Sequence, residues 1–97
     1  MNTLEAMLAK DRFSEWMKLR VTHFSQGSAT VEMTIREDML NGFGVVHGGV
    51  TFALADSAFA FACNSRNNLT LALDAQISFI KKVSLGDVLT ANVEELH

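Results

Sequence analysis

Residues 41–64 read NGFGVVHGGVTFALADSAFAFACN and constrain the fold more than any other stretch of the chain. Small and apolar residues fill nearly every position from Gly48 to Cys63, which predicts a helix from His47 or Gly48 to about Cys63. A helix that is apolar on almost all faces is typical of a buried element. Its many alanines allow a sheet to pack closely against it. We therefore expect the remainder of the chain to wrap a sheet around this helix.

A change in hydrophobic period before this helix predicts an N-terminal helix followed by a β-hairpin. Residues 3–17 carry apolar side chains at helical spacing, with an interruption at Asp11. From residue 19 the period becomes two, residues 25–28 form a turn cluster, and residues 29–36 alternate as in a half-buried strand. The residues expected to share one face of the first strand are Leu19, Val21 and His23.

Alternating residues after the central helix predict two more strands, at about 71–80 and 89–93, joined by a turn at 85–87. The predicted fold class is α+β, with an antiparallel sheet around a long central apolar helix. Four strands would leave much of such a helix bare. We therefore expect either that C-terminal strands are missing or that other subunits complete the fold.

Charge and composition exclude several classes of function. The formal net charge is −3 and no basic run is present, so neither nucleic acid nor membrane is expected as a partner. The stretch 49–63 is too short to span a bilayer and carries Asp56. The chain start lacks the pattern of a signal peptide and the single Cys63 cannot form an internal disulfide, which predicts a cytoplasmic location. The three histidines lack metal-ligand spacing and no dinucleotide or Walker motif is found, so we expect no metal and no nucleotide cofactor.

Two features of the central helix point to chemistry. Gly48 and Gly49 leave the backbone N–H groups of the first turn open to close approach, where the helix carries partial positive charge. A carbonyl oxygen bound there would be polarised as in an oxyanion hole, and a tight entry turn is the alternative explanation. Asp56 is a carboxylate in an apolar helix, a costly placement unless something needs it. It would act as general base or nucleophile, or else cap a neighbouring loop.

The spacing of Gly48 and Asp56 predicts how such a site would be assembled. They are eight residues apart, or about 12 Å along a helix, so one small acyl carbon cannot touch both within one chain. Two copies of the helix, antiparallel across a twofold axis, would bring Gly48 of one chain opposite Asp56 of the other. If both residues serve one reaction, the active protein is at least a dimer with two identical sites.

Several other residues allow two interpretations. His47 either contacts a substrate or holds its loop, and Asn41 either orients a water molecule or pins the same loop. Cys63 fits a core position better than a nucleophile. Lys81 and Lys82 are either solvated charges at a strand end or contacts to a phosphorylated ligand tail. Three phenylalanines either line an aromatic pocket or belong to the core. They are Phe43, Phe59 and Phe61.

These residues also resemble a known family, the hotdog-fold thioesterases, and are most similar to its phenylacetic-acid-degradation (PaaI-type) branch. The similarity continues beyond the central helix into residues 77–81 and 86–87, so it covers nearly the whole chain. An HGG triplet alone is a weak signal, but an Asn six residues before its His and an Asp nine residues after make it far more specific. The matching segments are 11–13, 41–42, 47–49, 55–58 and 62–64.

The resemblance implies a single hotdog domain over residues 1–97 that hydrolyses acyl-CoA thioesters, with aryl-acetyl-CoA such as phenylacetyl-CoA as substrate. Coenzyme A would enter as part of the substrate, and no further cofactor is implied. Polarisation of the thioester carbonyl falls to Gly48, water activation or direct attack to Asp56, and positioning to Asn41 and His47. A homodimer with sites between subunits, often paired into a tetramer, is implied. Substrate contacts are implied at Gly49, Phe59, Asn64, Lys81 and Lys82.

Two departures from the family pattern bear on this expectation. Lys81 and Lys82 stand where the family usually has Arg-Pro or a similar pair, so the positive charge remains without the rigid proline. Family members usually continue for two more strands, so we expect a C-terminally truncated domain. The alternatives are a non-enzymatic acyl-CoA binder or inactive fragment, and an acyl-thioester hydratase or dehydratase, whose His-acid motifs we do not find.

Overall fold

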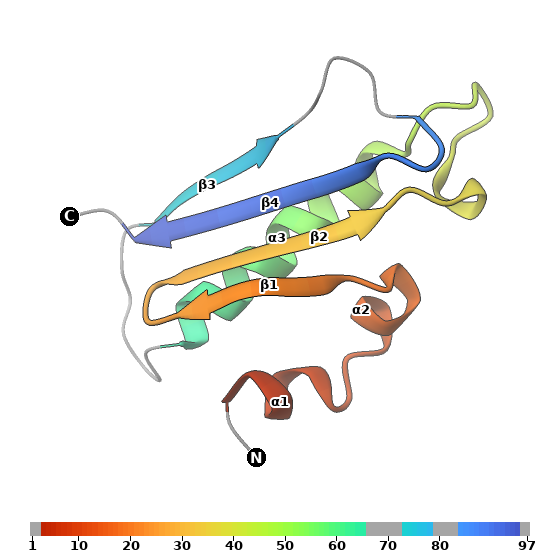
Figure 1. The fold of residues 1–97 in the computed structure, drawn as a ribbon. Coiled ribbons are helices and arrows are strands. Elements are labelled where there is room, and N and C mark those ends of the chain that lie inside the picture. Colours follow the sequence, from red (N-terminus) through yellow and green to blue (C-terminus); the bar gives the residue numbers. More distant parts are fainter. Residues whose placement is uncertain (1–2, 66–72, 79–83, 96–97) are drawn as a thin grey trace.

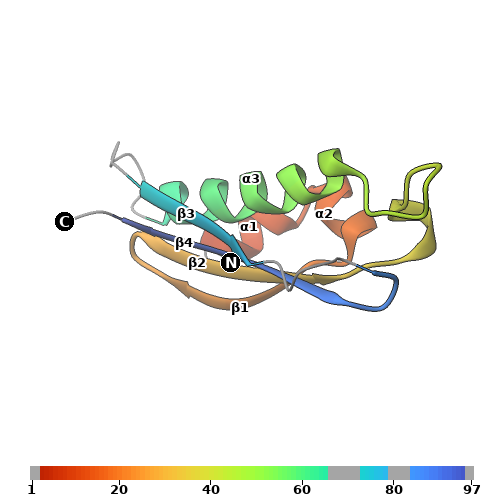
Figure 2. The same cartoon turned by 90° about the horizontal axis from the view of Figure 1, so that it is seen from above.

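The computed structural model describes residues 3–65, 73–78 and 84–95, in which a four-stranded antiparallel sheet carries helices on one side (Figures 1 and 2). The order of strands in the sheet is β1-β2-β4-β3. The α+β class and the order of elements predicted from the sequence are confirmed. In chain order the elements are α1 (Thr3–Leu8), α2 (Arg12–Met17), β1 (Arg20–Ser25), β2 (Ser28–Thr34), the 3-10 helix η1 (Glu37–Met39), α3 (Gly48–Asn64), β3 (Leu73–Ser78) and β4 (Val88–Glu95).

The hydrophobic core lies between α3 and the two adjacent strands β2 and β4. Strand β2 pairs with β4 so that Val31 lies beside Ala91 and Met33 beside Leu89, and all four are buried. These are the inward faces that the alternation predicted. The helix contributes a buried stripe whose small alanines allow it to lie close to the sheet. That stripe consists of Leu54, Ala58, Phe61 and Ala62.

The N-terminal apolar segment forms two short helices because Asp11 starts a new one. The Asp11 carboxylate accepts a hydrogen bond from the Ser14 backbone N–H at 3.0 Å, an N-cap of α2. Lys18, with φ of 52°, ends the helix. Met17 faces the core, whereas Phe13 and Trp16 remain exposed and stack with ring centroids 5.7 Å apart.

The prediction that His23 shares a strand face with Leu19 and Val21 is wrong. The pairing of β1 with β2 shifts register between Val21 and His23, so that one extra residue is inserted in β1. Such a β-bulge interrupts the two-residue alternation. His23 is therefore exposed, and Phe24 is the residue beyond the bulge that packs against the core.

As expected for a sheet of four strands, much of α3 is left bare in the single chain, so the helix is not buried on nearly all faces. The sheet covers one side of the helix, and α1 and α2 lie beside it on the same side of the sheet (Figure 2). The side of α3 facing away from the sheet is open. Phe52 is 71% exposed and Phe59 42%, and Asp56 between them is exposed as well. No helix among the described residues is long and apolar enough to cross a membrane.

The far end of α3 is tied to the tip of the first hairpin. The backbone N–H of Gly27 donates to the Ser65 hydroxyl at 2.7 Å, and this hydroxyl donates to the Ala62 carbonyl at 2.6 Å. Gly27 has φ of 75°, which the hairpin turn requires and which glycine adopts without strain. The hydroxyl of Ser65 thus links the last turn of α3 to the hairpin tip.

Candidate active site

The loop before α3 is held by the side chain of Asn41. Its Oδ1 accepts hydrogen bonds from the backbone N–H groups of Phe43 at 2.9 Å and Val45 at 3.3 Å. The backbone closes the same loop, because the Asn41 N–H donates to the Val45 carbonyl at 2.7 Å. The His47 N–H then donates to the Met39 carbonyl at 2.8 Å. Of the two interpretations of Asn41, the loop-pinning contact is the one seen within the chain.

His47 is the N-cap of α3. Its Nδ1 accepts a hydrogen bond from the Gly49 backbone N–H at 3.0 Å. Because a backbone N–H only donates, Nδ1 must carry no proton in this contact, and a neutral ring then has its N–H at Nε2. The imidazole is exposed. His47 therefore holds the helix start and also presents a donor to the outside.

The backbone N–H of Gly48 is left free by this arrangement. The next two donors, Val50 and Thr51, both reach the His47 carbonyl, and Gly49 is taken by the ring of His47. Within the described part of the chain, the Gly48 N–H donates to no acceptor. Gly48 is exposed, and a Cβ built on it meets no atom within 4 Å, so there is open space beside this residue. An external carbonyl oxygen has room to reach a donor at the positive end of the helix.

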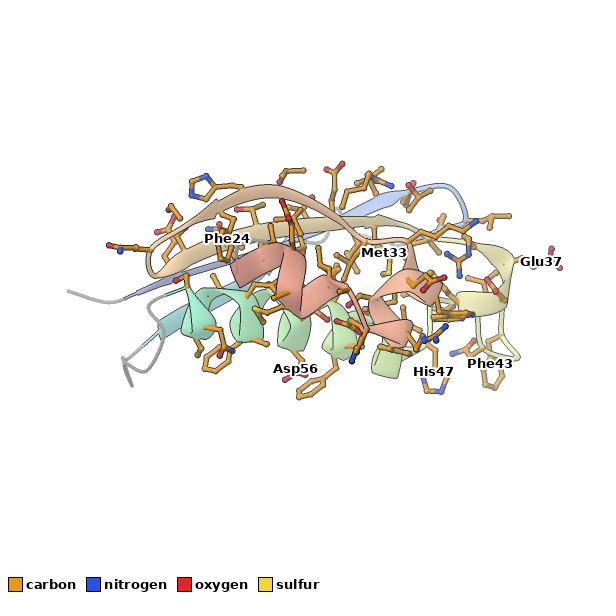
Figure 3. All side chains as sticks on the ribbon, turned by 90° about the horizontal axis from the view of Figure 1, so that it is seen from below. Phe24, Met33, Glu37, Phe43, His47 and Asp56 are labelled. Atoms are coloured by element: carbon orange, nitrogen blue, oxygen red, sulfur yellow. The ribbon has the colours of Figure 1, made fainter. Side chains whose placement is uncertain are left out.

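Asp56 lies on the face of α3 that looks away from the sheet, as do His47 and Phe43 at its start (Figure 3). The Asp56 side chain is exposed, and it has neither an ion pair nor a hydrogen bond among the described residues. Eight residues separate it from Gly48, about 12 Å along the helix. One chain thus presents a free amide and a free carboxylate on one surface, too far apart to act on the same small group.

The remaining predicted site residues divide into four groups. Phe59 lies on the open face near Asp56, and Phe43 is 91% exposed. Gly49 and Asn64 are engaged within the chain, Gly49 by the His47 cap and Asn64 by donating Nδ2 to the Ala60 carbonyl at 2.9 Å. Phe61 is buried in the core and Cys63 is half-buried. Lys81 and Lys82 lie outside the described residues.

Two features were not predicted from the sequence. Phe52 is the most exposed apolar residue of α3, and the spacing of Gly49, Phe52, Asp56 and Phe59 by three, four and three residues would have placed all four on one stripe. Arg36 covers the ring of Trp16 at 5.0 Å and donates Nη2 to its carbonyl at 2.6 Å. No signal in the sequence links these two residues.

Among the described residues, no group of three His, Cys, Asp or Glu side chains is placed to hold a metal ion. A hollow of about 220 Å³ lies beside α1 and α2, and none of its lining residues belongs to α3. Its lining includes Asp11 and Ser14, whose polar groups are already occupied by the α2 cap. The open face of α3 is therefore the candidate site.

Comparison with known proteins agrees with this choice. The family model described as the Thioesterase superfamily matches residues 43–97. The acyl-coenzyme A thioesterase PaaI of Escherichia coli is 38% identical over 95% of this chain and 66% of its own length. Human acyl-coenzyme A thioesterase 13 is 31% identical over 78% of this chain and 57% of its own length.

Solved structures show the same relationship. A mutant form of the phenylacetic acid degradation protein PaaI from Thermus thermophilus superposes with a TM-score of 0.74 at 37% identity. The match covers 90% of this chain and 75% of that one. The chain spans 57% to 66% of the length of the two curated relatives named above. With the helix, the HGG cap and the antiparallel sheet in place, the chain belongs to the thioesterase superfamily, in the PaaI-type branch of hotdog-fold proteins.

Proposed function

We propose that this chain hydrolyses acyl-CoA thioesters as a homodimer with two sites, each formed by Gly48 of one copy and Asp56 of the other. The proposal rests on two polar groups on one face of α3, a backbone N–H and a carboxylate, neither of which has a hydrogen-bond partner within the described part of the chain. Among the described residues, Gly48 is exposed and its N–H has no acceptor, and the Asp56 carboxylate is exposed without a partner. The separation of about 12 Å along α3 requires a second copy to bring such groups together.

In the proposed reaction the thioester carbonyl oxygen accepts a hydrogen bond from the Gly48 N–H. Asp56 takes a proton from a water molecule as its oxygen attacks the carbonyl carbon. Collapse of the tetrahedral intermediate breaks the C–S bond, and the CoA thiolate takes up a proton as it leaves. In the alternative, the Asp56 carboxylate attacks first, releasing CoA and forming a mixed anhydride that water then hydrolyses. Either route needs only water and the thioester, with coenzyme A as part of the substrate.

The proposed acyl group is an aryl-acetyl group such as phenylacetyl. Phe43, in the loop before α3, and Phe59, on its open face, are both exposed and support this choice because aromatic rings pack on one another. The names of two relatives of known structure refer to phenylacetic acid degradation. We further propose a cytoplasmic location, which the single, half-buried Cys63 fits.

The test is the release of free thiol from phenylacetyl-CoA by the wild type, Asp56→Asn and Glu15→Gln. Loss of the carboxylate at position 56 should lower kcat/KM by about 10²–10⁴-fold, which is the usual contribution of a general base. Glu15 is an exposed carboxylate on α2 away from the open face, so Glu15→Gln should keep wild-type turnover. Equal rates for the wild type and Asp56→Asn would refute the role of Asp56, and absence of turnover with every acyl-CoA would refute the hydrolase function.

A further inference from the structure

The open face of α3 carries a narrow stripe with alternating spacings of three and four residues. Its members are Gly49, Phe52, Asp56, Phe59 and Cys63. This repeat, averaging about 3.5 residues, is the pattern by which two helices pack along a common seam. Phe52 is 71% exposed and is the largest apolar surface of the stripe. A second copy of the same helix is the occupant that the charges on this stripe favour, as its possible registers show.

A twofold axis perpendicular to two antiparallel helices can pass beside a residue that then faces its own copy, and two registers of this kind differ in where they place Asp56. If Gly49 lies opposite Cys63, the residue on the axis is Asp56. If Gly48 lies opposite Asp56, the residue on the axis is Phe52, midway between them. The position of the axis along α3 differs between the two registers by four residues, about 6 Å, so one helix is displaced along the other by about 12 Å.

Electrostatics separates these registers. An axis at Asp56 would press two carboxylates together as the interface excludes water, and no described side chain on the stripe offers a compensating positive charge. An axis at Phe52 instead places each Asp56 at the N-terminus of the partner helix. That terminus has a free Gly48 N–H, and its first turn contains no acidic residue.

We infer that the two copies of α3 pair antiparallel with the twofold axis at Phe52, so that the two Phe52 rings pack on each other between the two active sites. This inference rests on the proposed function for the pairing of Gly48 with Asp56. It adds the contact that sets the register. The self-paired ring removes the most exposed apolar side chain of the helix from water and forms an aromatic pair.

The same register shapes each site. Moving outward from the axis, the Phe52 pair comes first and the Gly48–Asp56 contact second. Beyond that contact lies Phe59 of one copy, 42% exposed in the single chain, on the side of the loop that precedes α3 in the other copy. Each site is thus bounded by apolar side chains on both sides, which fits a substrate with an apolar acyl group. Phe52 is therefore a positioning residue, because it acts by setting where Asp56 meets Gly48.

The test is disulfide cross-linking of the full chain in a Cys63→Ser background, which removes the only cysteine. Phe52→Cys places a thiol on the inferred axis and should yield a covalent dimer, twice the single-chain mass, on mild oxidation. Asp56→Cys and Phe59→Cys serve as matched positions on the same stripe. With the twofold axis at Phe52, the two copies of residue 56 lie about 12 Å apart along the helices and the two copies of residue 59 about 21 Å apart. Both separations are beyond the reach of a disulfide. These two variants should remain uncross-linked.

A second measurement uses charge. Phe52→Lys brings two ammonium groups together on the axis and should therefore convert the dimer to a monomer. Light scattering measures this change in mass. Phe13→Lys, at a similarly exposed phenylalanine on α2, should leave the dimer intact. Cross-linking through position 56 instead of 52 would overturn the register, and so would cross-linking at none of the three positions or an intact dimer in Phe52→Lys.

Thiol release from phenylacetyl-CoA by the Cys63→Ser parent separates this inference from the proposed function. A parent that turns over, with no cross-link through Phe52→Cys, retains hydrolysis and overturns the register. A cross-link through Phe52→Cys in a protein that hydrolyses no acyl-CoA supports the register and refutes the hydrolase.

Discussion

The ring nitrogen Nδ1 of His47 accepts a hydrogen bond from the backbone N–H of Gly49, at 3.0 Å. This contact satisfies one of the donors at the start of α3 and leaves the neighbouring Gly48 N–H free. The histidine and the two glycines therefore have separate tasks. One residue caps the helix, one donates to the cap, and one is left for an external acceptor.

Removing the cap should destabilise the fold. His47→Ala loses the acceptor for the Gly49 N–H, and we expect the free energy of unfolding to fall by about 1 kcal/mol. His47→Asn supplies another side-chain acceptor of the kind preferred at helix starts, so it should recover most of that loss. Urea denaturation of the three proteins measures the difference. If His47→Asn is stable but slow in thiol release, the imidazole also contacts the substrate; equal stability of all three proteins would contradict the capping role.

The two glycines should respond differently to alanine. A Cβ at Gly48 meets open space, so Gly48→Ala should keep its free energy of unfolding or raise it by up to about 1 kcal/mol. A Cβ at Gly49 would lie 3.2 Å from His47 Nδ1 and disturb the cap, so Gly49→Ala should be the less stable variant. Thermal unfolding compares the two.

Gly48→Ala should nevertheless lower hydrolysis, because its methyl group holds a carbonyl oxygen away from the N–H. We expect a loss of up to about 10²–10³-fold in kcat, the range for a missing oxyanion donor. The stability of this variant makes the result specific, since unfolding cannot explain it. Wild-type turnover in Gly48→Ala would show that no substrate approaches this amide.

Asn41 can be tested for a role beyond the loop. Asn41→Asp keeps the Oδ1 acceptor for the N–H groups of Phe43 and Val45, whereas Asn41→Ala removes it. If Asn41 only pins the loop, Asp should restore both stability and turnover, while Ala loses about 1–2 kcal/mol of stability for two unmade hydrogen bonds. If the amide group of Asn41 also donates to water or substrate, Asn41→Asp should be stable and slow. Denaturation and thiol release on the same preparations distinguish these outcomes.

Arg36 should be a structural residue of the N-terminal region. It donates to the Trp16 carbonyl at 2.6 Å and lies over the Trp16 ring. We expect Arg36→Ala to lower the free energy of unfolding by about 1–2 kcal/mol. Arg36→Lys should lower it less, because lysine keeps the positive charge over the ring, although it loses the planar guanidinium group. Trp16 fluorescence during urea unfolding reports the change directly. Unchanged kcat in the folded variants would agree with contacts that involve only the N-terminal region and its neighbouring loop, whereas a stable variant with lowered kcat would contradict a purely structural role.

The sequence predicted the fold where one face of an element is buried. The alternation through Val31 and Met33 in β2, and through Leu89 and Ala91 in β4, survives because the inner faces of both strands lie under α3. The same reasoning failed at His23, because one inserted residue in β1 reverses the alternation and leaves no trace in residue type. The break at Asp11 was visible as an interruption, but its role as a cap required the contact with Ser14.

The site was predictable to the extent that helix geometry sets it. The distance from Gly48 to Asp56 follows from the rise per residue, and His47 at the helix start follows from the two glycines. The exposure of Asp56 in the single chain was not predictable. The apolar composition of α3 indicates that its faces are to be covered, but it does not show whether the same chain or a second copy covers them. Phe52 was overlooked for the same reason, since its aromatic character suits a core as well as an interface.

The tie between Ser65 and Gly27 has a mechanical consequence for a reaction centre divided between two chains. If α3 shifted along its own axis in both copies, the distance between the Gly48 amide of one copy and the Asp56 carboxylate of the other would change by twice that shift. The hydroxyl of Ser65 resists that sliding by anchoring the distal turn to the hairpin tip. In the proposed dimer, this contact, remote from any reacting atom, would therefore help to align both active sites.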